Sequence, residues 1–343
     1  MQIISTITNK IRLPVWWYHL VPPIFSVFYA IIYAGQVSVG IIGKDLLLFT
    51  ISIIGAAGFG YWLNDWTDLP SDSKVGKLNH TAGFTGSQKS AVLGTLLAMG
   101  WLPWLLLPAT TGALIALALL HICFLLYSVP PFRLKEKGFW GVFCDIHYGH
   151  ILPIAITLAT FIPLWLPDTP IHWNISILLL LLLYLKGFRN IVEHQISDRK
   201  NDRVNHINTF VIRIGPLKAA RLLSFVLVPF ELLVIAISLL QWQIEIFAAY
   251  LLFLILYVFL FQRWGVFRLP WRHRWFKCWY IANDFYEGWL PLSILVIACA
   301  ENGHYFPILI LHIILFSKNF QIFEWLWMEI KAKFLLHTAP LKL

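Results

Sequence analysis

Charged residues and cysteines are scarce in this chain of 343 residues. Only 13% of its residues are Asp, Glu, Lys or Arg, against about 25% in an average soluble domain, while 59% are apolar and 16% are aromatic. The four cysteines are scattered and form no CxxC pair, so neither a disulfide framework nor a zinc site is expected. No polar stretch is long enough to form a water-soluble domain. These absences exclude an ordinary soluble protein and indicate an integral membrane protein.

Long apolar runs dominate the chain, and crossing a bilayer takes roughly 17 to 25 such residues per helix. Nine candidate spans lie near residues 15–34, 45–63, 90–108, 110–128, 141–162, 174–190, 218–240, 244–262 and 278–299. The expected fold class is therefore all-α, a polytopic membrane bundle of about nine transmembrane helices. The apolar stretch at 304–317 is short, which leaves open a tenth crossing or a segment in the membrane interface, and we favour the interfacial segment.

Lysine and arginine gather in alternate connections between these runs. One side carries Lys44 alone, and the other carries Lys10, Arg12, Lys74, Lys77, Lys89, Arg133, Lys135, Lys137, the basic residues from Lys186 to Arg221 and those from Arg263 to Lys277. The positive-inside rule assigns the basic side to the cytoplasm of a cell (inner) membrane. Topology signals and attraction to anionic membrane lipid explain the net charge of +9, so no nucleic-acid partner is expected.

A cluster of polar side chains occurs twice, each time after an apolar run. The first acidic cluster is Asn64, Asp65, Asp68 and Asp72, and the second, 130 positions later, is His194, Gln195, Asp198 and Asp202. Positions i, i+3 and i+7 share one face of a helix, so the first three carboxylates would repel one another unless a cation lay among them. Oxygen ligands suit Mg²⁺, which proteins hold with a few carboxylates and substrate phosphates. Two matching clusters therefore predict one shared ligand, a diphosphate with Mg²⁺.

Three segments resemble the UbiA superfamily of intramembrane prenyltransferases. NDWTDLPSD at residues 64–72 matches that family's NDxxDxxxD, QISDRKNDRVNHINT at 195–209 is similar to its DxxDxxxDxxxGxxT, and YSVPPFRLKEKG at 127–138 is similar to its YSxPPxRLK. The resemblance implies a transmembrane prenyltransferase domain at residues 1–300 and a C-terminal apolar or amphipathic extension at 301–343. It also implies a central cavity among the helices, which would open to the cytoplasm.

The resemblance further implies that Mg²⁺, held by both clusters, receives a polyprenyl diphosphate whose prenyl group passes to an unidentified acceptor. The metal ligands would then be Asn64, Asp68, Asp72, Asp198 and Asp202, joined by Gln195 through its amide oxygen. The side chains expected to approach the phosphates are Lys77, Arg133, Lys135 and Arg199. Gln195 stands in an acidic position of the family pattern and His206 in a glycine position, so the chain resembles a divergent branch.

A second polar set lies inside the apolar runs. Asp145, His147, Tyr148 and His150 begin the fifth run, and Asn283, Asp284 and Glu287 begin the ninth. Ionisable groups within a membrane segment are costly and are commonly functional. We expect Asp145, Glu287 or Glu193 to take the proton that the acceptor loses, Asn283 to bind the acceptor, and Tyr127 to stack on a developing carbocation. Hydrogen bonding between helices is the alternative role for these residues.

Two other reactions fit the same fold and metal: a terpene cyclisation, and transfer of a phosphorylated sugar to a polyprenyl phosphate. A secondary transporter is a less favoured alternative from another class. Its acidic residues should lie near the bilayer midplane on interrupted helices, whereas both acidic clusters follow the ends of apolar runs.

Overall fold

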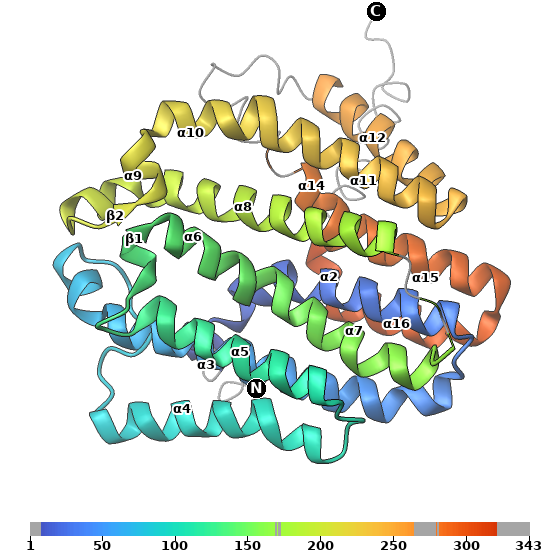
Figure 1. Ribbon diagram of the computed structural model, residues 1–343, viewed down its shortest axis with the longest axis horizontal. Helices are drawn as coiled ribbons and strands as arrows, with labels where there is room; N and C mark the ends of the chain where they lie inside the picture. The colour runs from blue at the N-terminus through green and yellow to red at the C-terminus, as the bar shows by residue number, and fades with distance from the viewer. Residues whose placement is uncertain (1–7, 169, 171–172, 264–278, 280, 321–343) are drawn as a thin grey trace, which may run out of the picture.

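The computed structural model describes residues 8–168, 170, 173–263, 279 and 281–320. The basic connection expected after Arg263 and the final part of the expected extension, 321–343, lie outside the described residues. Almost every described element is a helix, and the long helices run side by side along the length of the molecule (Figure 1).

The elements are given in chain order. The first half contains α2 (Leu13–Ala34), α3 (Val39–Lys74), α4 (Gly86–Trp101), η1 (Leu102–Leu105), α5 (Thr111–Ser128), η2 (Leu134–Glu136), β1 (Lys137–Gly138), α6 (Phe139–Ile146), η3 (His147–Ile151) and α7 (Leu152–Trp165). The second half contains α8 (Trp173–Val204), β2 (Asn208–Thr209), α9 (Phe210–Ile214), α10 (Pro216–Leu222), η4 (Leu223–Leu227), α11 (Val228–Trp242), α12 (Ile244–Arg263), α14 (Ile281–Asp284), η6 (Phe285–Trp289), α15 (Leu290–Glu301), η7 (Gly303–Tyr305), α16 (Phe306–Leu315) and η8 (Ser317–Phe320).

Six helical segments in the described part of the chain are long and apolar enough to cross a membrane. They are α2, α3, α5, the segment from α6 to α7, α8, and the segment from α10 to α11. The runs near 90–108, 244–262 and 278–299 fall mainly on helix but are not among these six. The all-α membrane bundle is thus confirmed, whereas nine crossings remain a prediction.

Two very short strands join connections that are far apart in sequence. β1 pairs in parallel with β2, with Lys137 opposite Asn208 and Gly138 opposite Thr209. The connection before α6 therefore lies beside the one that follows the second acidic cluster. In Figure 1 both strands lie at the same end of the bundle as the connection between α3 and α4, which follows the first acidic cluster.

The segment after α15 folds back along α2. The Tyr305 hydroxyl donates to the carbonyl of Ile32 at 3.1 Å, and the Trp17 indole donates to the carbonyl of Leu315 at 3.0 Å, so α16 runs antiparallel to α2. A helix of ten residues rises only about 15 Å, half of the ~30 Å hydrocarbon core. Its outer face is exposed and apolar, with Phe306 and Ile314 among the exposed residues. The structure thus shows α16 as a short helix packed against α2, and its place relative to the membrane interface stays a prediction.

Close backbone contact joins α3 to α4. A Cβ atom at Gly55 would lie 2.3 Å from the backbone nitrogen of Gly100 and 2.5 Å from the carbonyl carbon of Met99. At the same crossing, the Ser52 hydroxyl donates to the carbonyl of Gly100 at 2.7 Å. Small residues at a crossing allow two helices to approach closely in a membrane, so Gly55 sets the spacing of this pair.

We expect Gly55→Ala to destabilise the bundle by about 1–3 kcal/mol, since the added methyl group must push backbone atoms of α4 aside. Thermal unfolding of the purified protein in detergent measures the change. Gly43→Ala is the matched control, because Gly43 lies in the same helix with no atom within 4 Å of its Cβ position. Equal melting temperatures for the two variants would contradict the role of Gly55.

Candidate functional site

A cavity of about 490 Å³ lies within the bundle, a volume typical of ligand-binding cavities, which measure roughly 300–1,000 Å³. Part of its wall is apolar, with Leu20, Ile24, Phe49, Leu117 and Leu120 among the lining residues. Polar residues also line it, among them Arg12, His19, Ser52, Asn64, Ser128, Asp145, His150, Asn190, Glu193, His194, Ser197, Asn283 and Glu287. Asn64 and His194 belong to the two acidic clusters, so both clusters reach the cavity. Such a cavity suits an amphiphile with a polar head and an apolar chain.

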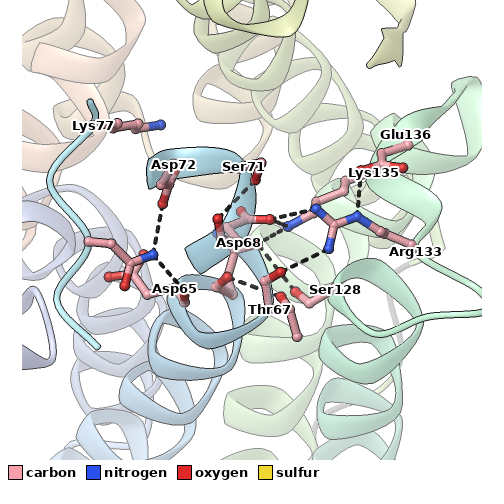
Figure 2. A network of polar contacts seen from close by, with 12 residues as sticks. Asp65, Thr67, Asp68, Ser71, Asp72, Lys77, Ser128, Arg133, Lys135 and Glu136 are labelled. Carbon is pink, nitrogen blue, oxygen red and sulfur yellow. Dashed lines mark hydrogen bonds and ion pairs between the residues drawn. The ribbon is translucent and has the colours of Figure 1, made fainter. Parts of the chain in front are cut away.

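The connection before α6 brings two cations to the first acidic cluster (Figure 2). Asp68 Oδ1 accepts from Lys135 Nζ at 2.5 Å and from Arg133 Nη2 at 2.8 Å. Lys135 Nζ also donates to Asn64 Oδ1 at 2.7 Å, and Arg133 donates to Glu136. The predicted phosphate-contacting residues Arg133 and Lys135 and the predicted metal ligands Asn64 and Asp68 thus lie together.

The charges of this group are partly shielded from water. Burial lowers the pKa of Lys135, although the neighbouring Asp68 carboxylate acts in the opposite direction. Burial alone would lower the pKa of Arg133 as well, but Glu136 and Asp68 raise it overall. Arg133 also has a φ of 36°, in the left-handed region that residues other than glycine seldom adopt. Backbone strain of this kind is concentrated at binding and catalytic sites.

The connection after α3 folds back onto the first acidic cluster. Asn79 Nδ2 donates to Asp72 Oδ2 at 2.8 Å and to the backbone carbonyl of Asp65 at 2.7 Å. Asp65 itself is buried, and its Oδ1 accepts from Arg12 Nη1 at 3.1 Å. Asn79 was not foreseen, since a single asparagine in a polar loop carries no pattern. It fixes Asp72 without neutralising its charge, and Asp65 anchors the start of α2.

The same connection reaches the second acidic cluster. Lys77 Nζ lies 3.4 Å from Asp198 Oδ2, and Lys74 Nζ donates to the carbonyl of Val204 at 3.4 Å. His194 Nε2 lies 3.6 Å from the same Asp198 oxygen, and Asp202 Oδ2 accepts from the Thr209 hydroxyl at 3.3 Å. The two clusters therefore share one end of the bundle, where Lys77 of the connection reaches Asp198 and Lys74, at the end of α3, reaches the end of α8.

Two predicted site residues have other roles in the structure. Gln195 is buried, and its Oε1 accepts from the backbone N–H of Val211 at 3.1 Å, so its amide oxygen holds α9 in place. Arg199 Nη1 donates to the carbonyl of Ile196 at 2.6 Å, on its own helix, and Arg199 is not among the residues that line the cavity. His206 has a φ of 56°, so the turn keeps the left-handed backbone expected of the family's glycine.

The oxygen ligands of the two clusters fit a metal ion only in part. Within the described ranges, no three Asp, Glu, His or Cys side chains form a group that could hold a metal by themselves. Asp68 and Asp198 face cations, whereas the partners found for Asp72 and Asp202, Asn79 and Thr209, are neutral. Mg²⁺ is commonly held by one or two carboxylates, water and substrate phosphates, without a complete protein cage. The residues therefore fit Mg²⁺ that binds together with a phosphate ligand.

Asp145 and Tyr127 line one wall of the cavity. The Tyr148 hydroxyl donates to Asp145 Oδ1, and the Tyr127 ring lies edge-on to the Tyr148 ring with centroids 5.1 Å apart. Tyr148 belongs to η3, a π-helical turn, and such turns occur frequently at functional sites. Glu193, the third predicted proton acceptor, also lines the cavity.

Glu287 lies in a second π-helical turn, η6, and is paired with a residue that the sequence patterns missed. Its Oε2 lies 2.8 Å from His19 Nδ1, and both residues line the cavity. An ionisable side chain inside the first apolar run was the available signal for His19. Asn283 also lines the cavity, but its Oδ1 accepts from Arg189 Nη2 at 2.8 Å.

Arg189 and Glu231 form an ion pair that is completely buried. Arg189 Nε donates to Glu231 Oε2 at 2.5 Å, and the exposed fraction of each side chain is 0%. Lys186, one turn earlier in α8, is also buried. The prediction that the basic residues from Lys186 to Arg221 lie in a cytoplasmic connection is therefore wrong for Lys186 and Arg189, since both lie inside the bundle in α8. The pair and Asn283 join α8, α11 and α14 beside the cavity.

Comparisons with known proteins agree with this arrangement. A sequence model of the UbiA prenyltransferase family matches residues 20–284. No curated protein matches the chain. A solved structure of a UbiA homologue from Archaeoglobus fulgidus bound to DMAPP and Mg²⁺ is 16% identical with a TM-score of 0.58, covering 84% of this chain and 99% of that one. A structure described as digeranylgeranylglyceryl phosphate synthase is 15% identical with a TM-score of 0.57, covering 88% and 100%. At these identities, the likeness to solved structures shows a common fold.

Replacing Glu231 by leucine should destabilise the protein by about 3–5 kcal/mol, because the Arg189 guanidinium would stay buried without its counter-charge. Unfolding of the variant in detergent measures this loss. The double variant Arg189→Met with Glu231→Leu should recover much of the stability, since no unpaired charge remains. A double variant no more stable than Glu231→Leu alone would contradict this explanation.

Proposed function

The chain belongs to the UbiA prenyltransferase family, and on that premise we propose that it transfers a polyprenyl group from its diphosphate to an acceptor within the membrane, with Mg²⁺ required. The observation that carries this proposal is the pairing of Asp68 with Lys135 and Arg133, next to Asn64 in the wall of a cavity that also has an apolar wall. A prenyl diphosphate matches this cavity, because its anionic head suits the cationic part and its apolar chain suits the apolar wall. Residues 1–300 would form the catalytic domain.

Asn64, Asp68, Asp72, Asp198 and Asp202 would hold Mg²⁺ together with the phosphate oxygens. Structures of the Archaeoglobus fulgidus homologue bound to DMAPP and Mg²⁺ and to GPP and Mg²⁺ support the choice of metal and of a prenyl diphosphate. When bound, the ion neutralises charge that builds on the departing diphosphate. Gln195 is left out of the ligand set because its amide oxygen already accepts from Val211.

Lys135, Arg133 and Lys77 would bind the diphosphate oxygens directly. Fixed cations near a leaving group stabilise the transition state, because negative charge grows there as the bond breaks. In the structure each of these cations faces a carboxylate, Asp68 or Asp198. We infer that phosphate oxygens replace part of these contacts when the substrate enters.

The prenyl chain would extend along the apolar wall, with its reactive carbon near Tyr127 and Tyr148. Aromatic faces attract a cation by roughly 0.5–2 kcal/mol each, which would favour the allylic carbocation as the diphosphate departs. The acceptor must lose a proton as the new bond forms, and Asp145, Glu193 and Glu287 all line the cavity.

The site would face the cytoplasm of the membrane that holds the protein. Lys74, Lys77, Arg133, Lys135 and Lys137 lie in or beside the connections that surround the two clusters, as the positive-inside rule requires of a cytoplasmic face. Mg²⁺ and anionic diphosphates would then enter from the aqueous side, while the prenyl chain remains at membrane depth.

Asp68→Ala and Asp198→Ala should each lower turnover of radiolabelled geranyl diphosphate by roughly 100-fold or more, because both carboxylates would help to hold the metal. The assay uses the purified protein with Mg²⁺ and a membrane lipid extract. The melting temperature should change little in Asp198→Ala, whose partner Lys77 is exposed, and should fall in Asp68→Ala, which leaves Lys135 and Arg133 without their carboxylate, so turnover is compared at a temperature where both variants are folded. Asp168→Ala is the matched control, since Asp168 is exposed and lies outside the cavity.

The products distinguish the three reactions. Radiolabel attached to a lipid of the extract indicates prenyl transfer, and labelled product that forms equally well without the extract indicates cyclisation. Radiolabel that stays on the diphosphate with every extract would end the prenyl-transfer proposal and leave phosphosugar transfer as the reaction to test.

A further inference from the structure

One pair of side chains in the cavity has the geometry of a base and the group that orients it. His19 Nδ1 lies 2.8 Å from Glu287 Oε2, and the exposed fraction of the side chain is 65% for His19 but only 9% for Glu287. The carboxylate therefore lies behind the imidazole, and the imidazole faces the cavity. No hydrogen bond from the described residues is found at His19 Nε2. When one imidazole nitrogen donates its N–H to a carboxylate, the other nitrogen has a free lone pair and can accept a proton.

The short C-terminal segment holds both members of the pair. Asn319 Nδ2 donates to the carbonyl of Tyr18 at 2.7 Å and to the carbonyl of Glu287 at 2.8 Å. One amide group thus joins the residue before His19 in α2 to Glu287 itself in η6. The backbones at this contact are closely packed, because a Cβ atom at Gly288 would lie 2.6 Å from the carbonyl oxygen of Asn319. Asn319 lies beyond residues 20–284, the part that matches the family.

The charges around the cavity disfavour an anionic acceptor. Three carboxylates line it, those of Asp145, Glu193 and Glu287, whereas its one lining cation among the described residues is Arg12. Arg12 is already paired with Asp65 at 3.1 Å. The charged groups that act on His19 from neighbouring elements are Glu287, Asp284 and Lys186. A neutral acceptor fits these surroundings, and a neutral hydroxyl compound needs a base before it can attack.

We propose that His19 is the catalytic base of the reaction proposed above, that its acceptor is a neutral hydroxyl compound, and that Glu287 and Asn319 are positioning residues. The acceptor forms a bond to C1 of the prenyl group as the bond from C1 to the diphosphate oxygen breaks. The electron pair of that bond leaves with the diphosphate, and the acceptor's proton moves to His19 Nε2. This assignment rests on the proposed prenyl transfer and replaces the carboxylates as the group that accepts the proton.

Glu287 and Asp145 are less suited to this step. Glu287 Oε1 is buried with no hydrogen-bond partner in the described structure, and Oε2 is bonded to His19, so an acceptor meets the imidazole first. Asp145 Oδ1 accepts from the Tyr148 hydroxyl. His19 combines exposure to the cavity with a carboxylate that fixes its ring.

Two acceptors of different acidity test the role of His19. Purified protein is incubated with Mg²⁺, radiolabelled geranyl diphosphate and either phenol or 4-nitrophenol, at a mildly alkaline pH where phenol is neutral and 4-nitrophenol is ionised. The carboxylates of the cavity should make ionised 4-nitrophenol the slower acceptor in the unsubstituted protein, so each variant is compared with the unsubstituted protein for the same acceptor. On that scale, His19→Gln should lower prenylation of phenol by about 100-fold, a typical contribution of a general base, and leave prenylation of 4-nitrophenol nearly unchanged. Glu287→Gln and Asn319→Ala should show the same selectivity with smaller losses. His304→Gln, which alters an exposed histidine at the start of η7, should behave as the unsubstituted protein.

The outcomes separate this inference from the function on which it rests. Cleavage of geranyl diphosphate that is retained in His19→Gln and lost in Asp68→Ala supports both. Equal losses with both acceptors, or loss of cleavage in His19→Gln, would overturn the role of His19. If the unsubstituted protein cleaves the diphosphate but prenylates neither of the two acceptors, phenol and 4-nitrophenol, the inference that the acceptor is a hydroxyl compound is wrong. Absence of any cleavage contradicts the proposed function itself.

Chemical modification of the unsubstituted protein tests the role of His19 even if the His19→Gln variant does not fold. Diethyl pyrocarbonate modifies accessible, unprotonated imidazole nitrogens, and peptide mass spectrometry locates the modified histidines. We expect His19 to be modified along with His304, with prenylation of phenol lost and prenylation of 4-nitrophenol retained. An unreacted His19 under conditions where His304 reacts would contradict an accessible Nε2.

Discussion

Pairing of buried charges is the constraint on which this structure depends. An ionised side chain removed from water without a partner costs several kcal/mol, so each cation inside the bundle must lie near an acceptor. Lys135 and Arg133 meet Asp68, Arg12 meets Asp65, and Arg189 meets Glu231. Each of these pairs joins elements that are distant in sequence. The same contacts that offset the cost of burial therefore hold the first acidic cluster beside the cavity, and Lys77 links it to Asp198 of the second cluster.

Two departures from regular helix supply polar groups to the cavity. The π-helical turns η3 and η6 interrupt two long helical segments and supply Tyr148, His150 and Glu287 to the cavity wall. The segment from η7 to η8 then packs along α2 and ties Tyr18 to Glu287 through Asn319. Asn319, outside the family match, thus holds two elements of the cavity wall together without lining the cavity itself.

Much of the site followed from the sequence because its spacing is local. Asn64, Asp68 and Asp72 share a helix face by periodicity alone, and the basic segment at 133–137 was expected near them. The roles of Gln195 and His19 were not accessible in this way. Whether the Gln195 amide faces a ligand or the N–H of Val211 depends on where α9 packs, and the contact between His19 and Glu287 joins residues 268 positions apart. The same limit applies to α16, whose packing against α2 joins Trp17 to Leu315.

The sequence alone determined that this is an all-α membrane protein with two acidic clusters at helix ends, because hydropathy and helical periodicity depend only on the order of neighbouring residues. The tertiary structure decided which of those polar residues serve the fold and which face the cavity. Asp65, Gln195 and Arg189 are used in packing, whereas His19 and Asp145 line the cavity. That division depends on contacts between helices, which the order of residues does not specify by itself.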